Sequence, residues 1–302
     1  MTAPGAANES ARSNTRGRRV ARWLHAHRDA QLRLLLLAPL AWMVVIYLGS
    51  LLVLLLNAFW AKDAFTNRVT PFDWTLDAFG EIFGNPVYRT IAARTISIAI
   101  LVTVTDVLLA FPIAYYMARI AAPRTRGILL VAVVMPLWAA YLVKTFAWRT
   151  ILQGNGIVAW IVSPFGLEGP GLDELPNAWI VLSYLWLPYM ILPIYAGLER
   201  IPASMLEASA DLGARAGATF RRVVLPLVFP ALVAGSIFTF SLSLGDYIVP
   251  DLVADAKFIG NVIHDNSSLG NLPLASAYSL LPISIMVAYL LLARRLGAFE
   301  SL

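Results

Sequence analysis

Cysteine is absent from this sequence of 302 residues, and histidine occurs only three times. The absence of thiols excludes disulfides and thiol chemistry. The histidines (His25, His27 and His264) do not combine with acidic residues at a spacing typical of zinc sites, which disfavours a metal enzyme. Charged residues make up only 14% of the chain, whereas soluble domains have about 25%. A soluble globular protein is therefore disfavoured.

Hydrophobic residues dominate instead, at 59% of the chain with a mean hydropathy of +0.71. A helix needs about 20 apolar residues to cross a hydrocarbon core of about 30 Å. Six stretches meet this requirement, which predicts an all-α integral membrane protein with spans at Leu34–Leu56, Thr95–Met117, Ile128–Phe146, Ala178–Leu198, Leu227–Ile248 and Leu274–Ala293. A further apolar patch, Ile157–Val162, is too short to cross and is expected in the interface or in a re-entrant loop.

The positive charge is uneven, with many arginines near the N-terminus. Residues 1–30 are predicted to be a disordered, basic cytoplasmic tail ahead of a membrane domain of residues 31–302. A basic arm also suits nucleic acid, but beside a long apolar run a cytoplasmic flank is favoured and no nucleic-acid partner is expected. Most of the 23 Lys and Arg residues then fall on cytoplasmic segments, which predicts both termini, and loop 199–226, in the cytoplasm.

The loop between the fourth and fifth spans has the pattern of a short helix that ends at a glycine. Pro202 suits the first helical turn, an apolar stripe follows at Met205, Ala208 and Leu212, and Gly213 suits a left-handed cap. The acidic Glu207 lies on another face together with Asp211, which disfavours a helix lying on anionic lipid. A short rigid helix of this kind is expected to seat in a groove of a soluble partner.

This loop resembles the EAA signature of ABC importer permeases: Glu-Ala-Ala, three residues, Gly, nine residues, then Ile-x-Leu-Pro. The chain has Glu207-Ala208-Ser209, Gly213 and Val223-Val224-Leu225-Pro226 at that spacing, with Ser209 and Val223 as departures. The resemblance implies the six-helix fold of type I ABC importer permeases. It also implies that an ATPase docks on Glu207, Ala208, Ser209, Asp211, Leu212, Gly213, Leu225 and Pro226.

The ATPase is expected to be a separate cytoplasmic subunit, because the chain contains no P-loop. The resemblance implies that it is present in two copies. The chain itself is then expected to bind no cofactor, and ATP and magnesium belong to the partner. The segments GDYIVPDLV (245–253), FIGNVI (258–263) and PLASAYS (273–279) resemble the first permease subunit of the spermidine/putrescine branch. That branch implies a second, paralogous permease and an extracytoplasmic binding protein, although importers of iron, sulfate, molybdate, thiamine and opines share parts of the architecture.

Two acidic residues lie in or beside predicted spans. Asp106 is near the middle of the second span, where a charge is costly; it is either a structural acid or a solute contact. Asp246, at the outer end of the fifth span, is either a local cap or a solute contact. Carboxylates and aromatic rings attract a polycation of primary amines, so the expected solute pathway comprises Asp106, Trp138, Tyr141, Trp186, Tyr189, Asp246 and Tyr247.

Three functions compete at this stage. The favoured one is a multi-pass inner-membrane subunit of an ATP-driven importer, with no chemistry of its own. An ion-coupled secondary transporter that uses Asp106 as its coupling acid leaves the EAA-like loop unexplained. A membrane enzyme needs clustered catalytic groups, which the three scattered histidines do not supply. The predicted outer segment Lys62–Asn85 is expected either to meet a binding protein or to be a solvated loop.

Overall fold

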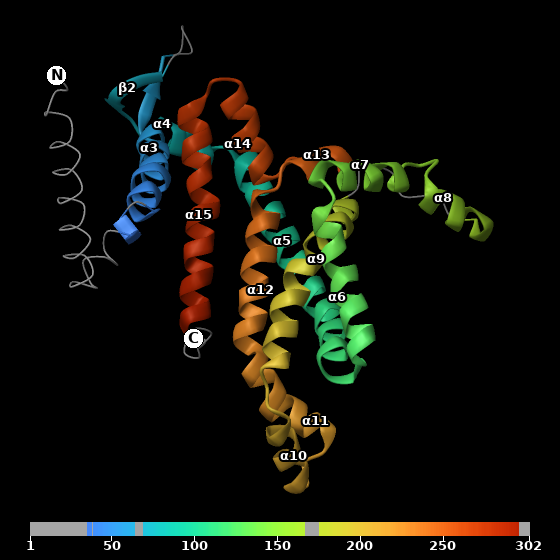
Figure 1. Cartoon of the computed structure of the whole chain (residues 1–302). Coiled ribbons are helices and arrows are strands. Elements are labelled where there is room, and N and C mark those ends of the chain that lie inside the picture. Colours follow the sequence, from blue (N-terminus) through green and yellow to red (C-terminus); the bar gives the residue numbers. More distant parts are fainter. Residues whose placement is uncertain (1–34, 38, 64–68, 167–174, 296–302) are drawn as a thin grey trace, which may run out of the picture. The chain divides into compact units, whose positions relative to one another are not determined.

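The computed structural model of the chain describes residues 35–37, 39–63, 69–166 and 175–295, which are drawn as coloured ribbons in Figure 1. The chain divides into two compact units, Met1–Leu56 and Asn57–Leu302. The predicted N-terminal tail, residues 1–30, lies outside the described residues. The described residues of the first unit belong to one apolar helical run, which includes a π-helical turn η1 (Met43–Leu48) and helix α3 (Gly49–Asn57) and ends one residue beyond the unit. This run agrees with the first predicted span.

Three helices form the core of the second unit: α5 (Pro86–Tyr115), α9 (Leu175–Glu199) and α12 (Leu225–Gly245). Each packs against the other two (Figure 1). Helix α9 is the central one, because 56% of its most apolar stretch is buried, compared with 22% for the span that contains α5. Helix α15 (Leu272–Arg295) completes the long apolar helices. The second, fourth, fifth and sixth predicted spans are therefore confirmed as helices.

Helices α9 and α12 approach each other closely at glycines. A Cβ atom added at Gly197 of α9 lies 2.6 Å from the Cβ of Ala231 of α12. A Cβ added at Gly235 of α12 lies 2.8 Å from the Sδ of Met190 of α9. Apolar burial drives helices together weakly in lipid, so close packing of small residues is a main source of association. These two glycines therefore set the separation of α9 and α12.

The third predicted span, Ile128–Phe146, is wrong as a single helix. Helix α6 (Pro123–Trp138) ends early, and the chain then bends by 94°. Helices α7 (Tyr141–Leu152) and α8 (Ile157–Val162) follow the bend. The linking residues Ala139 and Ala140 have extended ψ angles of 137° and 135°. Apolarity does not reveal such a break, because both sides of it are equally hydrophobic. The described residues hold five candidate spans, or six if this bent pair counts as one.

The predicted outer segment, Lys62–Asn85, contains regular structure in its described residues, which do not form a simple loop. Strand β1 (Trp60–Lys62) pairs antiparallel with β2 (Val69–Trp74), with Trp60 opposite Trp74 and Lys62 opposite Val69. Helix α4 (Asp77–Gly84) follows and packs against α15. At the same end of the second unit, α13 (Ile248–Val253) and α14 (Ile259–Ser268) connect α12 to α15 (Figure 1). We call this the α13 end.

Polar contacts join α14 to α5 at the α13 end. The backbone N–H of Ile259 donates to the hydroxyl of Thr95 at 3.0 Å, and Asn261 donates to the carbonyl of Tyr247 at 2.7 Å. A Cβ added at Gly260 lies 2.6 Å from the carbonyl oxygen of Gly245. The segments GDYIVPDLV and FIGNVI are therefore packing partners, which gives each of them a structural reason for its composition.

Replacement of Gly197 by Ala tests the close approach of α9 and α12. Because the added methyl group meets Ala231 at 2.6 Å, the helices must separate, and overpacking of this kind costs about 1–3 kcal/mol. We expect a lower melting temperature of the detergent-solubilised protein. Gly127→Ala in α6 is the matched control, since no atom lies within 4 Å of its added Cβ. Equal melting temperatures for the two variants would contradict the close contact.

Candidate coupling hairpin and solute site

The loop after α9 forms a short helix that ends as the sequence predicts. Helix α10 (Ala203–Asp211) begins after Pro202, and Gly213 has a left-handed φ of 77°. The N–H of Gly213 donates to Ala210 at 2.8 Å, and the N–H of Ala214 donates to Ser209 at 3.1 Å. These two bonds form a Schellman motif, which satisfies carbonyl groups that the end of the helix leaves free. The glycine thus fixes the direction in which the chain turns back.

The returning arm consists of α11 (Ala216–Thr219) and a π-helical turn η4 (Phe220–Val224), which leads into α12 at Leu225–Pro226. We call residues 203–224 the coupling hairpin. Its arms are joined by a hydrogen bond of 2.9 Å between the hydroxyls of Ser209 and Thr219. Ser209 is a departure from the EAA signature, and here its hydroxyl has a structural use.

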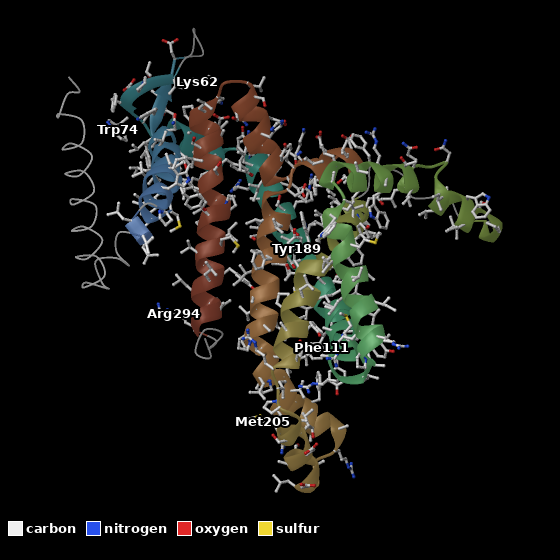
Figure 2. The ribbon with its side chains drawn as sticks, viewed as in Figure 1. Lys62, Trp74, Phe111, Tyr189, Met205 and Arg294 are labelled. Atoms are coloured by element: carbon white, nitrogen blue, oxygen red, sulfur yellow. The ribbon has the colours of Figure 1, made fainter. Side chains whose placement is uncertain are left out.

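The predicted apolar stripe of α10 is exposed to different degrees along the helix: Met205, in its first turn, borders a hollow beside α9 and α12, whereas Leu212 projects freely. Leu212 is 88% exposed and Met205 is 48% exposed, while Glu207, Ala208 and Asp211 are also exposed. Figure 1 shows α10 and α11 beyond the ends of α9 and α12, opposite the α13 end, and Figure 2 shows Met205 on this projection. An exposed apolar and acidic face on a rigid hairpin is suited to contact with another protein.

Two arginines that the sequence reading did not single out hold the base of the hairpin. Arg119, in the π-helical turn η2 (Tyr116–Ile120) that extends α5, donates from Nη2 to the carbonyl of Leu198 and, at 2.8 Å, to that of Ile201. Arg126 of α6 forms an ion pair of 3.2 Å with Glu199. Cations at a helix C-terminus stabilise it by interaction with the helix dipole. Helices α5, α6 and α9 are thereby joined where the hairpin begins.

An aromatic contact adds to this base. Phe111 of α5 meets Phe220 of η4 edge-on, with ring centroids 5.3 Å apart, and Leu206 of α10 packs against the core at this end. Figure 2 shows Phe111 toward the hairpin end of the bundle. The hairpin is therefore fastened to the helices at its base while its tip stays exposed.

Four of the predicted pathway residues meet in a concave site near the α13 end. Tyr141 of α7, Trp186 of α9, Asp246 and Tyr247 line a cavity of about 350 Å³, together with part of α12. The rings of Tyr141 and Trp186 are nearly parallel, with centroids 5.8 Å apart and an angle of 13° between planes. The Tyr141 hydroxyl donates to Oδ2 of Asp246. We call this the outer site.

Asp246 has a structural task in addition to its place in the outer site. Its Oδ1 accepts hydrogen bonds from the N–H groups of Ile248 at 2.9 Å and Val249 at 3.0 Å, which caps the start of α13. The interpretation of Asp246 as a local cap is thus confirmed. Its second oxygen, bonded to Tyr141, remains on the wall of the outer site, so the cap does not exclude a contact with solute.

The remaining predicted pathway residues lie elsewhere. Tyr189 contacts Trp186 edge-on at 5.9 Å and stacks on Phe238 at 6.4 Å, one turn below the outer site (Figure 2). Trp138, at the end of α6, is 88% exposed and does not line the outer site. Asp106 is fully buried between α5 and α9. The structure therefore gathers four of the seven residues in the outer site and places Tyr189 beside it, and it separates Trp138 and Asp106 from them.

A charged group also lies at the α13 end. Lys257 forms ion pairs of 3.1 Å with Asp251 of α13 and with Asp265 of α14. The hydrogen bond with Asp265 is the main reason why the pKa of Lys257 is raised, and burial acts in the opposite direction. His264 is exposed, and its ring stacks on Tyr247 with centroids 4.5 Å apart.

Residues 92–299 match a protein family described as "Binding-protein-dependent transport system inner membrane component". The chain belongs to this family. The inner membrane ABC transporter permease protein YdcU of Escherichia coli (strain K12) is 45% identical to it, over 89% of this chain and 90% of that protein. The spermidine/putrescine transport system permease protein PotB of Haemophilus influenzae is 30% identical, over 83% of this chain and 88% of that protein.

Solved structures show the same fold. A chain of a bacterial ABC transporter involved in the import of the acidic polysaccharide alginate superimposes with a TM-score of 0.65 at 18% identity, over 91% of this chain and 97% of that one. A second structure, with an alginate pentasaccharide-bound periplasmic protein, gives a TM-score of 0.69 at 17% identity. The all-α permease fold is thereby confirmed, and the protein is a multi-pass inner-membrane subunit of an ABC importer rather than an enzyme.

Arg119→Gln tests whether the arginine holds the base of the coupling hairpin in this permease. Loss of its bonds to Leu198 and Ile201 leaves the helix end without its cationic partner, so we expect faster hydrogen–deuterium exchange in residues 198–206. Arg200→Gln is the control, because the guanidinium of Arg200 forms no hydrogen bond or ion pair with the described residues. Unchanged exchange in the Arg119 variant, measured by mass spectrometry, would rule out this role.

Proposed function

We propose that this permease imports a small organic polycation of the polyamine class and that a separate cytoplasmic ATPase drives it through the coupling hairpin. In this arrangement both termini and the hairpin are cytoplasmic, and the α13 end faces the extracytoplasmic binding protein. A second, paralogous permease completes the pathway, and two ATPase subunits engage the two hairpins. ATP and magnesium stay on the ATPase.

The observation that carries the coupling part is the shape of the hairpin. Its tip presents Leu212 to solvent, while its base is fixed by Arg119 and by the contact of Phe111 with Phe220. A soft loop would absorb the motion of a partner, whereas a rigid projection transmits it to α9 and α12. This property supports a mechanical role better than attachment to lipid, since the exposed acidic residues oppose anionic headgroups.

The outer site supports a cationic cargo. Asp246 provides a carboxylate, and the rings of Tyr141, Trp186 and Tyr247 provide faces for cation–π contact. Anionic solutes such as sulfate or an acidic polysaccharide are disfavoured beside this carboxylate. PotB relatives named for spermidine and putrescine point in the same direction. Iron, thiamine and opines are the alternative cargoes, and uptake assays with each of these solutes in turn, alongside putrescine and spermidine, separate them.

Single cysteines test the docking of the hairpin cleanly, because the chain has none of its own. Leu212→Cys places a thiol on the exposed tip of the hairpin, and we expect a bifunctional thiol–amine reagent to link it to a nucleotide-hydrolysing subunit in membranes. Leu269→Cys, 77% exposed at the α13 end, is the control and is expected to give no such product. A crosslink to the ATPase from position 269 but not from 212 would reverse the proposed orientation.

Gly213→Val tests the rigidity that coupling requires. A branched residue at a φ of 77° costs about 1–2 kcal/mol in left-handed strain, so the hairpin must change direction. We expect uptake by the intact transporter to fall by about tenfold or more, because a strain of about 1.4 kcal/mol corresponds to a factor of ten. The amount of permease in the membrane is expected to change little. Gly217→Val, at a hairpin glycine without positive φ, is the control. Normal uptake by the Gly213 variant would contradict the coupling role.

Asp246→Asn tests the cargo. The amide oxygen keeps the cap of α13, since Asn and Asp cap helices about equally well, but the negative charge is lost. We expect a higher half-saturation concentration for putrescine and spermidine uptake, with normal folding. Asp251→Asn, which removes an exposed carboxylate paired with Lys257, is the matched control and is expected to have little effect. Equal effects of both substitutions would argue against a cation contact at Asp246.

A further inference from the structure

Unpartnered polar atoms concentrate at one place in the interior of the bundle. Six buried side-chain nitrogen or oxygen atoms in the described residues have no hydrogen-bond partner, and four of them belong to Asp106, Ser183 and Trp186: both carboxylate oxygens, the hydroxyl and the indole nitrogen. Buried polar groups are nearly always bonded, so a group of four needs an explanation. Asp106 is 0% exposed within this single chain, and a second subunit can only cover it further.

Asp106 and Ser183 face each other across the contact of α5 with α9. The Ser183 hydroxyl lies close to the Asp106 carboxyl, although no hydrogen bond of good geometry joins them. Ser183 and Trp186 are three residues apart, which places them on one face of α9. One turn before Asp106, Val102 belongs to the hydrophobic cluster that contains Trp186; one turn after it, Ala110 belongs to a different cluster around Met190. Asp106 therefore lies at the seam between two hydrophobic clusters, where the apolar packing is interrupted.

No protein cation compensates the carboxylate. Among the described residues, no Lys, Arg or His forms an ion pair or hydrogen bond with Asp106. Protonation alone does not solve the problem, because a neutral carboxyl group still needs an acceptor for its O–H and a donor for its other oxygen. The described residues thus leave these oxygens without donors, and a group from outside the chain that carries several donors would supply them.

We infer that Asp106 and Ser183 form an inner binding site for a primary ammonium group of the solute, with Trp186 as the partition between this site and the outer site. The inference rests on the proposed cationic cargo. An ammonium group has three N–H donors, and the two carboxylate oxygens and the Ser183 hydroxyl offer three acceptors. The number of donors on the ammonium group thus equals the number of acceptors in the site, and the charges of the two are opposite.

Trp186 is suited to separate the two sites. One face of its ring stacks on Tyr141 at the outer site, whereas its indole nitrogen is buried without an acceptor. Pro188 follows two residues later inside α9, and a proline removes one backbone hydrogen bond and weakens the helix locally. A shift of α9 here changes the position of Trp186 and connects the outer carboxylate, Asp246, with the inner one.

Two substitutions of Asp106 test the inner site in the complete transporter. If nothing in the resting protein satisfies the carboxylate, Asp106→Leu and Asp106→Asn both relieve the burial of a charge and raise the melting temperature of the purified complex. We expect the same variants to lose at least about tenfold of putrescine uptake and to lose the thermal stabilisation that putrescine gives the wild-type complex. Greater stability combined with lost transport is the signature that a purely structural acid does not produce.

Hydroxyl variants provide the matched controls. Ser183→Ala removes a proposed ammonium ligand and is expected to lower putrescine uptake several-fold. Ser243→Ala removes a buried hydroxyl that is already bonded to the carbonyl of Thr239 at 2.8 Å, and it is expected to leave uptake unchanged. Comparable losses for both serines would indicate a general effect of helix packing and would overturn the inner site.

The outcomes separate this inference from the proposed function. Failure of the wild-type transporter to take up putrescine or spermidine would overturn the proposed cargo. Wild-type uptake together with normal uptake by the Asp106 variants would leave the cargo intact and overturn the inner site. A fall in melting temperature for both variants would also overturn it, because Asp106 would then be a structural acid bonded within the bundle.

Discussion

The packing of α9 between α5 and α12 is the constraint on which the rest of the permease depends. Helix α9 contains Pro188 and Pro193, so it lacks two of its own backbone hydrogen bonds. Lipid cannot replace them, whereas neighbouring helices can satisfy or shield the freed groups. The glycine contacts with α12 and the bonds from Arg119 hold this weakened helix in one position at two levels.

The position of α9 also connects the two ends of the second unit. Its C-terminal end carries the coupling hairpin, and Trp186, nearer its start, lines the outer site. A force applied at the hairpin reaches Trp186 through one continuous helix, in which the proline-weakened segment lies between the two. Under the proposed coupling role, such an arrangement would convert a displacement of the hairpin into a local change at the aromatic wall without requiring the whole bundle to move.

Apolar run length and turn chemistry made most of the fold predictable. Gly213 predicted a left-handed helix cap because few other residues tolerate that conformation, and in the structure this glycine has a φ of 77°. The break at Ala139 and Ala140 was not predictable, since two alanines carry no signal for extended backbone. The pairing of Tyr141 with Asp246, which are 105 residues apart, and the clamp formed by Arg119 arise only from tertiary packing, so composition could identify these residues but not their partners.

The two membrane-level carboxylates look alike in sequence and differ in the structure for a physical reason. Asp246 is fully bonded, through two backbone N–H groups and a tyrosine, so its position is fixed whether or not solute is present. Asp106 has no bonded partner and is buried. A pathway must bind its solute weakly enough to release it. In the proposed pathway, a fixed outer carboxylate that shares its charge with the protein is followed by an uncompensated inner one, which would attract a cation inward. A change in the position of α9 that exposes Asp106 to water would remove that attraction again.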